Sequence, residues 1–185
     1  YDLATGKETW RMSGGGGIPV PAPVVSGDLI FLTSNHQPIN PTDPPQPIFA
    51  IKTSASGDIS TPPGGGLNAS VAWLLTQRGS YMQTPLVVGD CLYCCNDAGV
   101  LACYDARTGQ NHYTERLGTG NSGFTASGVS AEGKLYFTSE LGAVHVVKLR
   151  VAVVDGDENL VGKLLIHGDD TSLDAVEGRE ATFAL

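Results

Sequence analysis

The sequence is poor in basic residues and contains no long apolar run. It holds 11 Lys and Arg against 19 Asp and Glu, which gives a net charge of −8. Nucleic-acid binding depends on clustered Lys and Arg, so this composition argues against such a partner. The apolar runs are far shorter than the roughly 20 residues that cross a bilayer, and we expect no transmembrane segment. The chain opens at Tyr1 without a signal-peptide pattern, and we expect a piece of a longer protein.

Patterns for catalysis and metal binding are missing as well. The His residues are scattered, without a metalloprotease motif or a Ser nucleophile in a G-x-S-x-G turn; they are His36, His112, His145 and His167. The Cys residues lack the paired spacing of a zinc site and are interpreted as small apolar strand residues; they are Cys91, Cys94, Cys95 and Cys103. We therefore assign no catalytic, cofactor-binding or metal-binding residue.

Two glycine- and acid-rich segments resemble ligand motifs but fail on context. Gly118–Gly123 fits G-x-G-x-x-G, yet a strand is expected after it, whereas a dinucleotide site needs a helix there. Asp155–Asn159 begins like a calcium loop, but Leu160 and Ile166 stand where an EF-hand requires Gly and Glu. A looser calcium site at Asp155–Asn159 stays open beside a solvated acidic turn.

Glycine and proline are abundant and fall in clusters. The 24 Gly and 11 Pro separate short runs of Val, Leu, Ile, Tyr and Phe. Helices tolerate such interruptions poorly, whereas a sheet protein with many tight turns requires them. The composition predicts an all-β fold.

Two motifs recur along the chain. Asp2–Trp10 and Asp105–Tyr113 both read D-x-x-T-G-[K/Q]-x-x-aromatic. Pro23–Phe31 and Pro85–Tyr93 share a strand–Gly-Asp–strand pattern, and Phe124–Phe137 gives a third copy. The last two copies are 43 residues apart and the first two are 62 apart, which is 43 plus an insertion of 19. Short strands that repeat at about 40 residues are typical of β-propeller blades.

One repeat can be divided into four antiparallel strands. Pro85–Val88 and Cys91–Cys95 form the first hairpin, and Val100–Asp105 and Asn111–Leu117 form the second. Alternation along Cys91–Cys95 sends the neighbouring Cys94 and Cys95 to opposite faces of the sheet. Asp, Thr and Gly of the repeated turn are predicted to satisfy backbone groups, and the aromatic residue to fill space between blades.

These motifs resemble the pyrroloquinoline-quinone-like repeat family, which forms propellers of four-stranded blades. The family includes quinoprotein alcohol dehydrogenases and the lipoprotein of the outer-membrane β-barrel assembly complex. The resemblance implies an incomplete ring of about three and a half blades over residues 1–148. Its blades are the last strand in 1–13, then 21–79, 82–117 and three strands in 124–148. A vicinal Cys pair caps the quinone in some family members, but the alternation at Cys94 and Cys95 disfavours that role here.

Three segments depart from the blade pattern. Residues 149–185 carry eight acidic and three basic residues and neither motif, so we interpret them as an acidic C-terminal extension. Leu149–Val154 could supply the fourth strand of the last blade, with irregular chain beyond it. Asn35–Pro47 and Thr53–Ser70 lengthen two loops of the blade at residues 21–79 and are predicted to be irregular surface loops.

Strand direction predicts which loops share a face. If each first strand runs away from one end, the interblade loops and the second-to-third-strand turns gather at that end. This candidate binding face mixes a cation, aromatic rings, amides and acids. Its residues are His36, Arg78, Tyr81, Gln83, Asn96, Asp97, Asn121, Phe124 and Glu140.

The resemblance implies a non-catalytic binding or scaffold propeller of a bacterial envelope, periplasmic or extracellular. Its partner would be a protein, the rest of the propeller, or a second copy joined through open blade edges. The alternative is part of a quinone- and calcium-dependent dehydrogenase, which would need a calcium site and a Trp floor for the quinone. No cofactor is expected, because the sequence shows no convincing set of such residues.

Overall fold

The computed structural model describes residues 1–35, 44–60 and 66–149, with four short strands beyond them. His36 of the candidate binding face and the acidic segment Asp155–Asn159 lie outside the described residues. The described parts consist of strands and turns, and they contain no helix long and apolar enough to cross a membrane.

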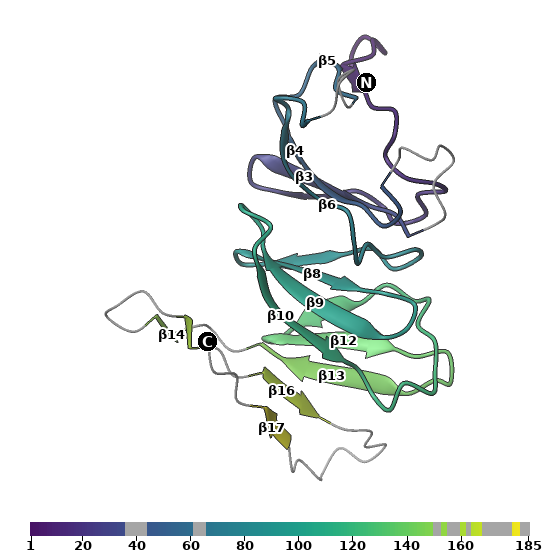
Figure 1. The fold of residues 1–185 in the computed structure, drawn as a ribbon, viewed down its shortest axis with the longest axis vertical. Helices are drawn as coiled ribbons and strands as arrows, with labels where there is room; N and C mark the ends of the chain where they lie inside the picture. The colour runs from purple at the N-terminus through teal and green to yellow at the C-terminus, as the bar shows by residue number, and fades with distance from the viewer. Residues whose placement is uncertain are drawn as a thin grey trace.

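Three antiparallel sheets follow one another along the molecule (Figure 1). The first contains β2 (Val24–Ser26), β3 (Leu29–Thr33), β4 (Ile48–Lys52) and β6 (Val71–Leu75). The second contains β7 (Leu86–Val88), β8 (Cys91–Cys95), β9 (Val100–Asp105) and β10 (Asn111–Arg116). The third contains β11 (Val129–Ala131), β12 (Lys134–Thr138), β13 (Val144–Lys148), β16 (Leu164–His167) and β17 (Arg179–Ala181).

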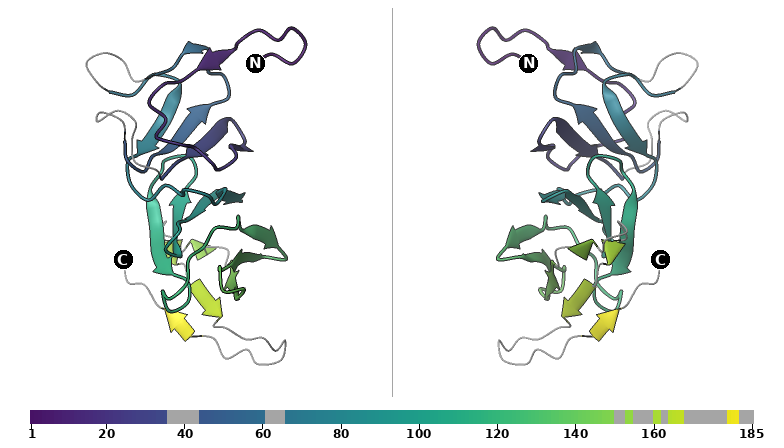
Figure 2. Two further views of the ribbon diagram at one scale, coloured as in Figure 1. Left: turned by 90° about the vertical axis from the view of Figure 1, so that its right-hand side faces the viewer. Right: turned by 90° about the vertical axis from the view of Figure 1, so that its left-hand side faces the viewer.

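The sheets have the arrangement of propeller blades. Strands within each sheet pair in order, and the first strands β2, β7 and β11 are neighbours from one sheet to the next. The two side views in Figure 2 show the sheets succeeding one another along the long axis. The prediction of an all-β, incomplete propeller with four-stranded antiparallel blades is confirmed.

The edge of the last blade differs from the sequence-based expectation. The strand beside β13 is β16, so Leu149–Val154 as the fourth strand was wrong. The chain turns away at Leu149, whose N–H donates to the Gly133 carbonyl, and β14 (Val153–Val154) pairs instead with β15 (Leu160–Val161). The apolar run Leu164–Ile166 supplies the missing strand, and β17 adds a fifth.

The N-terminal segment packs on the outer face of the first full blade. β1 (Trp10–Arg11) pairs in parallel with β5 (Gly57–Asp58), which lies inside the insertion Thr53–Ser70. Ala55 and Ile59 from the same insertion are buried. In the described part of this insertion, the expectation of an irregular surface loop was therefore wrong, because its apolar residues cover a sheet face.

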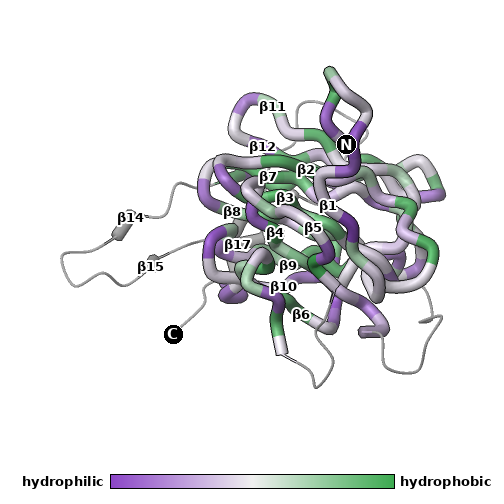
Figure 3. The backbone as a smooth tube through the Cα atoms, turned by 90° about the horizontal axis from the view of Figure 1, so that it is seen from above, coloured by the Kyte–Doolittle hydropathy of each residue, from purple (hydrophilic) through white to green (hydrophobic). Residues whose placement is uncertain are grey.

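The apolar cores lie between sheets. Phe31 and Trp73 of the first blade pack against Leu92 and Tyr104 of the second. A second cluster joins the second and third blades, and a third cluster covers the outer face of the first blade. Figure 3 shows the matching concentration of hydrophobic residues along the central strands. Burial therefore holds each blade to its neighbour rather than filling one central core.

The repeated D-x-x-T-G turn has the same hydrogen bonds in both copies. In the second, Asp105 Oδ1 accepts from the Thr108 N–H at 2.7 Å and from Thr108 Oγ1 at 2.8 Å. In the first, Asp2 Oδ1 accepts from the same two groups of Thr5. Partial burial raises the pKa of Asp105, but the bonds from Thr108 outweigh this and hold its pKa below the usual value. The structural role predicted for this motif is confirmed.

A hydroxyl at one repeated position links each blade to the next. The Ala22 N–H donates to Thr84 Oγ1 at 3.2 Å, and the Thr84 N–H donates to Ser127 Oγ at 3.0 Å. These residues precede the first strands of successive blades, at the same 62- and 43-residue steps as the repeat. The bonds therefore follow the propeller repeat from blade to blade.

Candidate functional site

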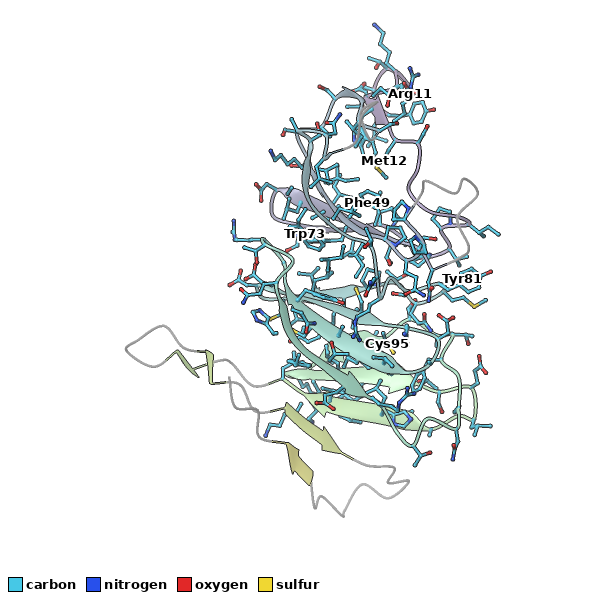
Figure 4. All side chains as sticks on the ribbon, in the orientation of Figure 1. Arg11, Met12, Phe49, Trp73, Tyr81 and Cys95 are labelled. Atoms are coloured by element: carbon cyan, nitrogen blue, oxygen red, sulfur yellow. The ribbon has the colours of Figure 1, made fainter. Side chains whose placement is uncertain are left out.

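The interblade loops and the second-to-third-strand turns meet at one end of the blades, which we call the loop face. It is built from residues 76–85, 96–99, 117–128 and 139–143. Direct bonds join these segments, because the Phe124 N–H donates to the Asp97 carbonyl and the Glu140 N–H donates to the Gly123 carbonyl. Tyr81 marks this end in Figure 4. The loop face is thus a connected surface rather than a set of separate loops.

Two residues of the candidate binding face are buried. Gln83 is 1% exposed and Phe124 is 2% exposed. Gln83 Nε2 donates to the Phe124 carbonyl, and the Phe124 ring lies 5.3 Å from the His145 ring. Both therefore support the surface from below.

The other described members reach the surface to different degrees. Arg78, Asp97, Asn121 and Glu140 are exposed, and Tyr81 is half-buried. Asn96 is also half-buried, and its Oδ1 accepts from the N–H groups of Ala98 and Val100, so it stabilises its own turn. Of the predicted set, the exposed residues remain as contact candidates.

A small hollow of about 90 Å³ opens in the loop face between the second and third blades. Its walls combine loop residues with the start of β13, and they include Phe124 and Asn121 of the predicted set. The remaining lining residues are Leu117, Gly118, Thr119, Gly120, Ser122, Ser139, Leu141, Ala143 and His145. Sequence reasoning missed Ser139 and His145 as site residues, although both belong to the third copy of the blade.

Unsatisfied polar atoms concentrate at the same end. Among the described residues, four buried side-chain atoms have no hydrogen-bond partner: Ser80 Oγ, Gln83 Oε1, Tyr104 Oη and Ser139 Oγ. All but Tyr104 belong to the loop face. Native proteins pair most buried polar groups, so a local excess points to a ligand or bound water.

The cysteines separate into two groups by burial. Cys94 packs between the first two full blades and Cys95 between the second and third, so the pair does point to opposite faces. Burial raises the pKa of each thiol to about 12. Cys91 is only half-buried, and a hydrogen bond from the Cys103 thiol lowers the pKa of Cys91 to about 7. All four cysteines are free thiols.

We expect Cys91 to be alkylated by iodoacetamide before the other cysteines. The thiolate is the reactive form, so the rate at Cys91 should rise with pH up to about 7 and then level off. Cys94 and Cys95 should react only after urea unfolds the chain. Peptide mapping by mass spectrometry at several pH values measures each rate, with Cys91→Ser as the control. Equal labelling of Cys94 in the folded chain would contradict the assignment.

The described residues do not fit a quinone–calcium site. No group of three or more His, Cys, Asp or Glu side chains in the described ranges is arranged to hold a metal ion. Cys94 and Cys95 face separate cores, so they cannot cap a shared ligand. The candidate site is therefore the loop face with its hollow.

Several solved structures resemble this chain in fold. A quinohemoprotein alcohol dehydrogenase, ADHIIG from Pseudomonas putida HK5, aligns over 75% of this chain with 14% identity and a TM-score of 0.51. The fold is that of a quinoprotein-type β-propeller. BamB from Moraxella catarrhalis aligns over 78% of this chain with 15% identity and a TM-score of 0.48. A europium-containing methanol dehydrogenase also covers 78%, with 13% identity and a TM-score of 0.46.

This chain matches only part of each of these longer structures. The chain spans 44% of the BamB structure, 24% of the methanol dehydrogenase and 20% of the alcohol dehydrogenase. No protein-family model matches the sequence, and no curated protein matches it. The likeness concerns the arrangement of blades, so function has to be argued from the loop face.

Proposed function

We propose that this propeller is a non-catalytic binding or scaffold module of a bacterial envelope, and that its loop face receives a protein partner. The observation that carries the proposal is the grouping of three buried, unpartnered polar atoms at that face, in Ser80, Gln83 and Ser139. Leaving a buried polar atom unpaired costs about 1–3 kcal/mol, so a buried water, or a local rearrangement on partner binding, that pairs these atoms would stabilise the face.

The composition of the face supports a protein as the partner. The loop face carries exposed Arg78, Asp97, Asn121 and Glu140 together with half-buried Tyr81, so it combines polar and charged groups with an aromatic residue. Protein interfaces are enriched in Tyr and Arg and bounded by a polar rim. The opposite end carries the hairpin turns and the Thr-Gly turns, and in the Thr-Gly turns the Asp side chains bond their own backbone.

Photo-crosslinking distinguishes the two ends of the blades. With a benzoylphenylalanine at Asn121 or Glu140, we expect one common protein adduct when the chain is irradiated in a bacterial envelope extract. The same probe at exposed Asp28 or Glu132, in hairpin turns at the opposite end, is the matched control and should give no such adduct. Mass spectrometry of the adducts identifies the partner and the linked residue.

Two results would overturn the proposal. Equal adducts from both ends would show that the loop face is not selective. Saturable binding of pyrroloquinoline quinone in the presence of calcium, followed by visible absorption, would favour the dehydrogenase alternative.

A further inference from the structure

The hollow in the loop face contains a buried hydroxyl that no described residue satisfies. Ser139 is 4% exposed, lines the hollow, and its Oγ has no hydrogen-bond partner among the described residues. The His145 ring and Phe124 form the floor beside it, and Leu117 and Ala143 add apolar wall. A hydroxyl that both donates and accepts is thus held against apolar surface.

The equivalent positions in the other two blades are satisfied. Ser34, Asn96 and Ser139 follow the second strand of successive blades at the 62- and 43-residue steps of the repeat. Ser34 Oγ donates to the Gly17 carbonyl, and Asn96 Oδ1 accepts from two backbone N–H groups of its turn. The blade does not need the Ser139 hydroxyl for its own turn, which leaves this group for a ligand.

The loop that lines the hollow packs closely on the third blade. A Cβ added at Gly118 would lie 2.8 Å from the His145 ring, and residues 118–122 line the hollow between the second and third blades.

The walls select an uncharged ligand. No Asp, Glu, Lys or Arg lines the hollow, and His145 is the one ionisable residue in its lining. The walls are otherwise uncharged, so an ion moved there would lose water with little compensation. The Glu140 carboxylate lies close to Gly123 in the adjoining loop, which further disfavours an anion. Neutral groups with both a donor and an acceptor remain.

Size narrows the choice to a short group. The hollow of about 90 Å³ has room for a group of a few heavy atoms. A primary amide has this size, donates through NH₂ and accepts through its oxygen, and its CH₂ can contact the Phe124 ring. It matches the Ser139 hydroxyl better than an alcohol, which has one polar atom.

We propose that the hollow binds the side-chain amide of an Asn or Gln that a partner protein inserts into the loop face. This inference rests on the proposed function, since it names the group by which the partner is anchored. The chemistry on the chain's side is hydrogen bonding from and to Ser139 Oγ, with apolar contact from Phe124.

The test is an NMR titration of the isotope-labelled 185-residue chain with acetamide, which carries the amide alone. Saturable shifts are expected at the backbone N–H groups of Gly118 and Ser139 and at the His145 ring. Acetate and methylammonium, the charged probes of similar size, should give none. Ser139→Ala should weaken acetamide binding about five- to tenfold, as expected for one lost hydrogen bond.

The controls separate binding from folding. Ser139→Ala should keep or raise the urea midpoint, because it removes an unsatisfied group, whereas Ser34→Ala should lower the midpoint and leave acetamide binding unchanged. Ala143→Leu, which fills the hollow, should abolish the shifts.

Three outcomes would overturn the inference: unchanged acetamide affinity in Ser139→Ala, equal binding of acetate, or no saturable shift with any probe. The last would mean that the hollow holds water only. A loop-face crosslink that persists in Ser139→Ala would retain the proposed function while rejecting the amide anchor.

Discussion

Replacing Trp73 with Ala is expected to lower the free energy of unfolding by about 3–5 kcal/mol. Trp73 is 7% exposed and sits on β6, at the seam between the first and second full blades (Figure 4). Its ring lies 5.8 Å from that of Phe31, and its Nε1 donates to the Ala106 carbonyl at 3.0 Å. Truncation would remove apolar contact and leave a cavity between two sheets.

The contact reaches the repeated turn of the next blade. A Cβ added at Gly109 would lie 2.9 Å from the Trp73 ring, so Gly109 is required for this approach as well as for its φ of +75°. Trp73→Phe is the matched control. It keeps most of the packing and loses the bond to Ala106, which should cost about 0.5–1.5 kcal/mol.

Urea unfolding followed by circular dichroism measures both variants. If Trp73→Ala lowered stability no more than Trp73→Phe, the packing of the ring between blades would not hold them together, and the prediction would fail.

Replacing Phe124 with Ala, at the seam between the second and third blades, is expected to lower the free energy of unfolding by a similar amount, about 3–5 kcal/mol. The Phe124 ring is buried in the cluster that joins the second and third blades and stacks at a tilt on His145. It also lies over Gly99, where an added Cβ would be only 2.4 Å from Phe124 Cε2. The ring and this glycine therefore occupy one shared space.

A double-mutant cycle tests whether the Phe124 ring and a side chain at position 99 compete for the same space. Gly99→Ala should be strongly destabilising in the wild-type chain, through the clash and a φ of +71°. In the Phe124→Ala background the clash disappears and only the backbone cost, about 1 kcal/mol, should remain. Additive effects of the two substitutions, measured by urea unfolding, would show that the ring and Gly99 do not compete for space.

The repeat was sufficient to predict the blades, because short strands, Gly-Asp hairpins and the D-x-x-T-G turn are all local signals. Strands β7 to β10 were predicted within a residue or two, and the bonds of Asp105 follow from its spacing to Thr108. The alternation that separates Cys94 from Cys95 is equally local. Each of these features depends on residues close together in sequence.

Features that depend on distant segments were not predictable. β16 joins β13 across a gap that no repeat spans, and the burial of Ala55 and Ile59 depends on the N-terminal segment beside them. The same limit applies to the site. Asn121 could be placed at the loop face from strand direction, but the burial of Gln83 and Phe124 arises from contacts between loops. Ser139 is distinguished from its counterparts Ser34 and Asn96 only by their hydrogen bonds, which its own hydroxyl lacks.

The hydrogen bonds that join Ala22, Thr84 and Ser127 link neighbouring blades in the same way whatever the length of the blade. The first full blade is 19 residues longer than the second, yet its first strand is tied to the next by the same kind of bond. The extra residues enter after the second and third strands of the blade, away from the residue that makes this bond. An insertion of 19 residues in one blade is therefore compatible with the same bond between neighbouring blades, which leaves the length of these connections free to vary.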